Sequence, residues 1–81
     1  MPSNQPKELI IAYDIADPRR LSRVHRLIKK VALPLQYCVF YTQMNQKQRD
    51  KLVQLLEHHI NPKEDNVRIY PLTSSYQALY I

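Results

Sequence analysis

The sequence predicts an α+β domain in which one antiparallel sheet carries two helices on a single face. Two amphipathic segments with helical spacing alternate with short apolar or alternating segments typical of strands, and no internal repeat interrupts this order. The chain has 81 residues, enough for only one modest core, so residues 1–81 are predicted to form a single domain. The elements follow one another as strand, helix, strand or hairpin, helix, strand.

The first strand is predicted from Glu8 to Tyr13, a short apolar run that suits a central strand covered on at least one face. Asp14 follows directly. Asp17 then precedes Pro18, and an aspartate N-cap with proline at the first helical position marks the start of a helix. Residues 1–7 are polar and interrupted by prolines, and we expect them to be flexible.

The first helix is predicted from Pro18 to Val31, because its apolar residues repeat as one buried stripe. The stripe consists of Leu21, Val24, Leu27, Ile28 and Val31. The opposite side carries a basic ridge, whose residues step by four, three and four along the helix. The basic ridge consists of Arg19, Arg23, Arg26 and Lys30. It is either an ordinary solvated face or a surface that binds a polyanion.

The segment from Leu35 to Thr42 is rich enough in aromatic and β-branched residues to be strand, and Pro34 before it is expected to stop the helix. Residues 33–42 fit two arrangements. One is a single bent strand, and the other is a short strand that turns sharply into a longer one.

Asn45 and Gln48 have the spacing of a capping box, which predicts a second helix after them. Its apolar stripe consists of Leu52, Val53, Leu55, Leu56 and Ile60. Asn61-Pro62 is expected to end this helix.

A last strand is predicted from Val67 to Leu72, where apolar and polar residues alternate and Pro71 closes the run. The tail, residues 73–81, is too apolar for a disordered end, and we expect an extra edge strand or a docking segment there. The complete order is the split βαβ pattern of a ferredoxin-like βαββαβ sandwich with an additional C-terminal edge segment.

Composition limits the function. The net charge of +5 and the sequence pI near 9.6 favour polyanionic partners such as nucleic acid. The chain contains no glycine, which excludes the phosphate-binding loops of nucleotide-cofactor enzymes. Cys38 is the only cysteine, so no internal disulfide forms, and we expect a reducing cytoplasm. The apolar runs are too short to span a bilayer, so no membrane association is expected.

Asp14 is the best candidate for a catalytic and metal-binding residue. It lies at the carboxyl end of the first strand, beside a helix N-terminus, where open sheets commonly place ligands. The alternative is a turn-forming aspartate. One carboxylate does not hold Mg²⁺ firmly, but a two-fold dimer would supply a second copy, and dimerisation would also enlarge a small core. Such a site would polarise a phosphodiester and activate water for attack.

The other reactive side chains have structural explanations. His58 and His59 close the second helix, where cations complement the helix dipole, and His25 adds polarity to the basic helix. Cys38 is expected to be a small core thiol. Tyr13, Phe40 and Tyr41 lie on predicted strands, where aromatic residues belong more often to a core or interface than to a base-stacking surface.

Four stretches stand in a characteristic order and spacing. They are Ile10-Ile11-Ala12-Tyr13-Asp14-Ile15, Asp17-Pro18-Arg19-Arg20, Gln36-Tyr37-Cys38-Val39-Phe40 and Asn66-Val67-Arg68-Ile69-Tyr70-Pro71-Leu72. Together they resemble the CRISPR-associated protein 2 family over nearly the whole chain. The chain departs from the family pattern at Cys38, usually serine, at Leu33-Pro34-Leu35, where a basic residue commonly begins the second strand, and at Tyr41, often acidic.

The resemblance implies a ferredoxin-like homodimer with a metal-binding aspartate, here Asp14, and Mg²⁺ or another divalent cation as cofactor. It implies an endonuclease that acts on single-stranded RNA or double-stranded DNA. It also implies a central dimer that bridges the CRISPR-associated protein 1 integrase and holds DNA when new spacers are acquired for antiviral defence. For the nucleic-acid surface the resemblance indicates Arg19, Arg20 and Arg23, with Phe40 in support. The basic ridge adds Arg26 and Lys30 to this predicted surface, and Tyr13 is a further supporting residue.

Three functions therefore stay open from the sequence. The first is a metal-dependent hydrolase of phosphodiester bonds. The second is a non-catalytic scaffold in which basic helices grip duplex DNA and the tail docks the integrase. The third is a related toxin-like ribonuclease of the same fold without an integrase partner.

Overall fold

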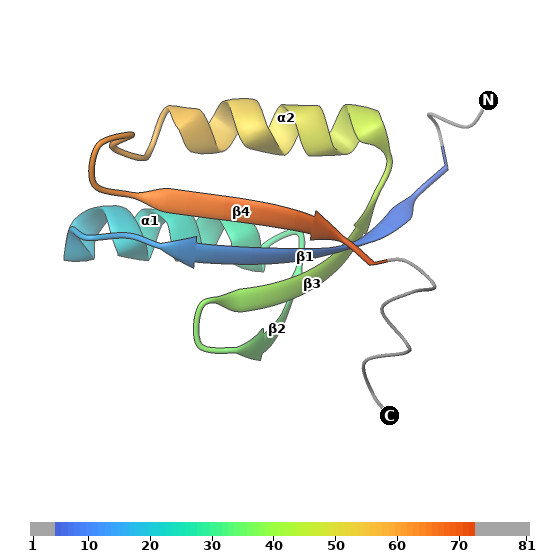
Figure 1. The fold of residues 1–81 in the computed structure, drawn as a ribbon, viewed down its shortest axis with the longest axis horizontal. Coiled ribbons are helices and arrows are strands. Elements are labelled where there is room, and N and C mark those ends of the chain that lie inside the picture. The colour runs from blue at the N-terminus through green and yellow to red at the C-terminus, as the bar shows by residue number, and fades with distance from the viewer. Residues whose placement is uncertain (1–4, 73–81) are drawn as a thin grey trace.

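The computed structural model describes residues 5–72, in which four strands form one antiparallel sheet in the order β2-β3-β1-β4. Its first strand, β1, pairs on one side with β3 and on the other with β4 (Figure 1). The strands are β1 (Lys7–Asp14), β2 (Leu33–Gln36), β3 (Val39–Met44) and β4 (Asn66–Pro71). With two helices between them, this is the predicted ferredoxin-like arrangement.

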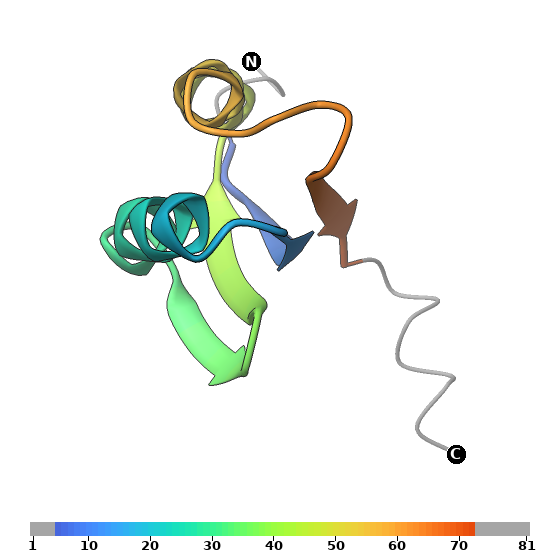
Figure 2. The same cartoon turned by 90° about the vertical axis from the view of Figure 1, so that its left-hand side faces the viewer.

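Both helices, α1 (Pro18–Lys29) and α2 (Gln46–Glu57), cover the same face of the sheet (Figure 2). Side chains of β1 alternate accordingly: Leu9, Ile11 and Tyr13 are buried under the helices, whereas Asp14 is exposed. We call the sheet face without helices the open face. No helix within residues 5–72 has the length and hydrophobicity that a membrane crossing requires.

The start of α1 is as predicted, but its end is not. The Asp17 carboxylate accepts hydrogen bonds from the backbone N–H groups of Arg19 and Arg20, at 3.0 and 2.9 Å. The helix ends at Lys29, and the N–H groups of Lys30 and Val31 bond to carbonyls three residues back, which tightens the last turn. Val31, predicted to be buried, is consequently 45% exposed.

Pro34 therefore does not stop the helix. It lies in β2, at the edge of the sheet, where a residue without an N–H group interrupts no internal ladder. Residues 33–42 form the second of the two predicted arrangements, a short strand that turns at Tyr37 and Cys38 into a longer one.

The capping box of α2 is confirmed, since Asn45 and Gln48 exchange side-chain and backbone hydrogen bonds of 2.9 and 2.8 Å. The predicted stripe is too broad: Leu52 and Leu56 are buried, but Val53 and Leu55 are exposed. Rather than at Asn61-Pro62, the helix ends at Glu57.

The last strand begins one residue earlier than predicted and ends at Pro71. Lys7, expected in a flexible segment, is the first residue of β1 and pairs with Met44. The predicted edge or docking tail, residues 73–81, lies outside the described residues.

One hydrophobic core joins the sheet to both helices, and its fully buried side chains are Phe40, Ile11, Ile28 and Val24.

Candidate nucleic-acid and metal site

Asp14 is the last residue of β1, and its exposed side chain belongs to the open face. It pairs in register with Asn66 of β4. Within residues 5–72 its carboxylate forms neither a salt bridge nor a hydrogen bond. Asp17, three residues later, occupies the amide donors at the start of α1, so Asp14 has no part in capping the helix. The alternative prediction, a turn-forming aspartate, therefore does not explain why a carboxylate stands at position 14.

One protomer provides only part of a metal site. In the part of the chain that the structure describes, no three histidine, cysteine, aspartate or glutamate side chains come together. Mg²⁺ takes six oxygen ligands, commonly one or two carboxylates with water and phosphate oxygens. The exposed Asp14 carboxylate suits such a site as one ligand, and a second carboxylate has to come from another molecule.

Arg68 is a neighbour of this carboxylate that the sequence reasoning did not single out. It is exposed on β4 and pairs with Ala12, two residues before Asp14, so Arg68 and Asp14 are diagonal neighbours on the open face. The alternation predicted for this strand was the signal that could have indicated it. A guanidinium beside the carboxylate is suited to hold a phosphate group there.

The basic ridge lies on a different side of the molecule. Arg19, Arg23 and Arg26 are exposed on α1, which packs on the sheet face opposite to Asp14. Lys30, expected on the helix, is exposed at its C-cap. The structure therefore brings the basic ridge together along one helix but separates it from the carboxylate by the thickness of the sheet.

Arg20 differs from the other arginines because its guanidinium is held by two acids. Its Nε atom lies 2.8 Å from the Asp65 carboxylate, and one terminal nitrogen lies 2.9 Å from Glu64. Asp65 also accepts hydrogen bonds from the backbone N–H groups of Ala16 and Asn61, at 3.0 and 2.7 Å. We call this group of contacts the Arg20–Asp65 clasp.

The clasp ties the segment that follows β1 to the turn that precedes β4. The Asp65 side chain is fully buried. The hydrogen bonds of Arg20, followed by those from the backbone of Asn61 and Ala16, lower the pKa of Asp65 to about 2. Its hydrogen bond to Asp65, followed by the one to Glu64, raises the pKa of Arg20. Because 45 residues separate the two partners, no local sequence pattern indicated their contact.

Tyr13 and Phe40 are buried beneath the helices, where their rings stack with centroids 6.0 Å apart. The hydroxyl of Tyr13 forms a 2.8 Å hydrogen bond with Nδ1 of His25, whose ring meets Phe40 edge-on. Burial is the main cause that raises the pKa of Tyr13 to about 12, so the phenol stays protonated at neutral pH. These two aromatics thus support the end of β1 from inside the core.

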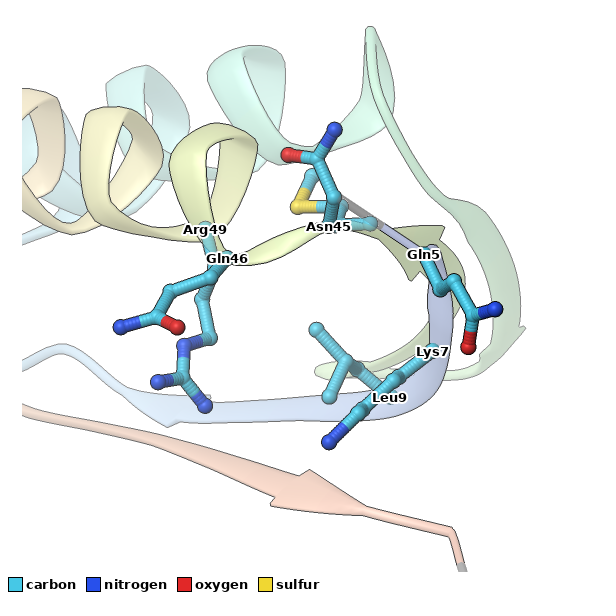
Figure 3. Close-up of a pocket in the computed structure, with 7 residues that line it drawn as sticks. Gln5, Lys7, Leu9, Asn45, Gln46 and Arg49 are labelled. Atoms are coloured by element: carbon cyan, nitrogen blue, oxygen red, sulfur yellow. The ribbon is translucent and has the colours of Figure 1, made fainter. Parts of the chain in front are cut away.

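A pocket of about 310 Å³ lies at the other end of β1, between the starts of β1 and α2 (Figure 3). Two cations, Lys7 and Arg49, are among its lining residues, which include no carboxylate, thiol or imidazole. Seven residue steps of strand, about 23 Å, separate Lys7 from Asp14. This pocket offers no negatively charged ligand for a cation and belongs to neither part of the candidate site.

Comparison with known proteins agrees with the fold and with the resemblance. Residues 7–78 match the family model described as CRISPR associated protein Cas2. A protein from Nitrosomonas europaea named CRISPR-associated endoribonuclease Cas2 1 is 45% identical over 65 residues, which are 80% of this chain and 62% of that protein. The chain thus spans less than two thirds of this relative's length.

Solved structures show the same fold. A hypothetical protein from Thermus thermophilus aligns with a TM-score of 0.82 and 25% identity over 85% of this chain and 84% of its own. Cas2 from Streptococcus pyogenes aligns with a TM-score of 0.76 and 23% identity over 89% of this chain and 93% of its own. The structural likenesses show the shared fold, and the match of residues 7–78 to the family model places the protein in the CRISPR associated protein Cas2 family.

Proposed function

We propose that this protein is a metal-dependent endonuclease of RNA or duplex DNA that works as a homodimer in CRISPR adaptation. The observation that carries the proposal is the Asp14 carboxylate, which is exposed at the end of β1 and has no partner within residues 5–72. The endoribonuclease name of the Nitrosomonas relative supports the same chemistry.

The open face supports the dimer. In register across it lie Ile10 of β1, Tyr41 of β3 and Tyr70 of β4, and no described element covers them. Tyr70 is 47% exposed, and Leu33, which pairs with Tyr41, is 65% exposed. A second copy packed on this apolar face through a two-fold axis near the strand ends would bring two Asp14 carboxylates together.

In this dimer the two carboxylates of Asp14 would hold one divalent cation, Mg²⁺ being suited to the oxygen ligands. The bound cation would supply charge neutralisation of the scissile phosphate and a lower pKa for an attacking water. Arg68 orients the phosphate beside Asp14. Arg19 and Arg23 hold backbone farther along the same nucleic acid, on the helix side of the sheet, whereas Arg20, engaged by Asp65, serves chiefly to position the segment after β1.

A second candidate is a non-catalytic scaffold that holds duplex DNA and bridges the CRISPR-associated protein 1 integrase. The observation that favours it is the separation of the basic ridge from Asp14 by the sheet. Exposed arginines spaced along one helix grip a phosphate backbone whether or not a carboxylate is nearby.

Cleavage by Asp14→Asn and wild-type dimer, measured with Mg²⁺ on RNA and on duplex DNA, tests the first candidate. Loss of a metal ligand is expected to reduce the rate by about 100-fold or more, since even outer partners of metal ligands cost about 10–100-fold. Sedimentation should show both proteins as dimers. An unchanged rate in the variant would remove the metal role, and DNA binding that persists would then support the scaffold.

A further inference from the structure

Tyr37 stands almost completely in solvent, with 93% of its surface exposed. It occupies the turn between β2 and β3 with Cys38, where Gln36 pairs with Val39. Two-residue hairpin turns usually use glycine or asparagine in positive-φ conformations, yet no residue from 5 to 72 has a positive φ. Neither turn propensity nor packing explains a large aromatic ring at this tip, and such exceptions to local rules concentrate at functional sites.

Tyr37 is one of the residues that line a pocket of about 250 Å³ between the hairpin turn and α1. The pocket is mostly apolar, and it is lined by Tyr13, Pro18, Leu21, Ser22, His25, Tyr37 and Cys38. It is smaller than the roughly 300–1,000 Å³ of pockets for whole drug-sized ligands, so it suits a single flat ring system.

The floor of this pocket is already ordered. Tyr13 and His25 satisfy each other through the 2.8 Å hydrogen bond, and both rings pack on Phe40. Nδ1 of His25 is used in that bond, and no residue from 5 to 72 forms a hydrogen bond with its other ring nitrogen. A rigid apolar site with one polar edge is the arrangement that positions a heteroaromatic ring.

Positive charge flanks the pocket. Ser22 lines it, and Arg19 and Arg26 lie three residues before and four residues after Ser22, which makes them its neighbours on the helix surface. Neither arginine forms an ion pair within the described part of the chain. A single-stranded nucleic acid that places one base in the pocket would therefore bring the phosphates on either side of that base to these guanidinium groups.

We infer that the Tyr37 pocket binds an unpaired nucleobase, which stacks on Tyr37 while Arg19 and Arg26 contact the adjacent phosphates. This inference rests on the proposed function in that nucleic acid is the ligand, and it adds a recognition site for single strands. Bases inside a duplex are already stacked and paired, so only a single strand, an overhang or a flipped base enters. Because Asp14 follows Tyr13 directly, the occupied pocket would lie at the same strand end as the candidate metal ligand.

The test uses a single-stranded RNA that contains 2-aminopurine, titrated with full-length protein carrying Asp14→Asn so that no cleavage intervenes. Stacking quenches 2-aminopurine fluorescence. Quenching is expected in this background and in its Tyr37→Phe variant. In Tyr37→Ser it should disappear, with affinity reduced by about 10-fold. The matched control, Leu35→Ser, changes an exposed apolar residue of the same hairpin outside the pocket and should bind normally.

Two results of the binding titration would overturn the inference. One is unchanged quenching by Tyr37→Ser, and the other is full affinity in Tyr37→Leu, which would show an apolar contact without stacking, as in a protein-docking surface. Unfolding midpoints verify that every variant is folded. The test is independent of cleavage: a wild-type protein that cuts nothing contradicts the proposed nuclease only, whereas normal cleavage of RNA by Tyr37→Ser with an unchanged KM contradicts this inference only.

Discussion

At the scale of single residues, the charged groups around β1 divide into those already engaged and those left available. Arg20 is bound to Asp65, which also accepts hydrogen bonds from the backbone of Ala16 and Asn61, whereas Asp14 and Arg68 face solvent on the open face. An ion pair whose carboxylate is buried and fully hydrogen-bonded holds the segments around it in place. Exposed charged side chains that form no ion pair within residues 5–72, such as those of Asp14 and Arg68, are available to bind a ligand. We therefore assign Arg20 and Asp65 to positioning the segment after β1, and Asp14 and Arg68 to binding a ligand.

The clasp makes a pH-dependent contribution to stability. Asp65 has a pKa of about 2 in the folded chain, below the value of about 3.9 for an unperturbed aspartate. Its stabilisation is therefore complete above about pH 4 and is lost as the pH falls through about 2. We expect Asp65→Asn to lower the unfolding temperature at pH 7, and the difference from wild type to shrink between pH 4 and pH 2.

Unfolding temperatures measured from pH 7 to pH 2 check this expectation. The control is Asp50→Asn, which changes an exposed carboxylate of α2 that has no ion pair within residues 5–72. A constant difference between wild type and Asp65→Asn across this range would show that the Asp65 charge does not stabilise the fold.

At the scale of elements, local signals predicted the helix starts well. The Asp17 N-cap with its following proline and the Asn45–Gln48 capping box each depend on residues at most three positions apart. Both caps form as expected. The end of α1 was missed because Pro34 is an edge-strand residue here. The exposure of Val53 and Leu55 depends on how α2 lies on the sheet, which a periodic pattern alone does not fix.

The site was predictable to a similar extent. Asp14 follows from its place after an apolar strand, and the basic ridge follows from helical spacing. The engagement of Arg20 was not predictable, because its partner Asp65 is 45 residues away and reaches it only through the fold. The Tyr13–His25 bond joins a strand to a helix and likewise left no local pattern.

The basic ridge leads to a prediction about α1 as a whole. Each phosphate contact adds about 0.9 to the slope of log K against log salt on duplex DNA. If Arg19 and Arg23 each contact a phosphate, changing both to alanine should weaken binding and lower this slope by about 2. Fluorescence anisotropy at several salt concentrations measures it.

A matched double variant, Lys47→Ala with Lys51→Ala, removes the same charge from the exposed side of α2. We expect it to leave the slope nearly unchanged. Equal losses from both double variants would show that the net charge of the protein, rather than the basic ridge, determines binding.

At the scale of the whole molecule, the two faces of the sheet carry different candidate functional groups. The helices and the basic ridge occupy one face, and the open face carries Asp14 with the exposed side chains of Leu33 and Tyr70. Within residues 5–72 no three potential metal ligands come together, so the proposed metal site at Asp14 depends on a second copy packed against the open face. Dimerisation and metal binding are therefore two aspects of one arrangement.

The stoichiometry of divalent metal binding tests this arrangement most directly. Calorimetric titration of the purified protein with Mn²⁺, in place of the weaker-binding Mg²⁺, should give one high-affinity ion for every two chains, and Asp14→Asn should abolish this binding while the dimer persists. One ion per chain, or the same binding in the variant, would contradict a metal shared between two Asp14 carboxylates.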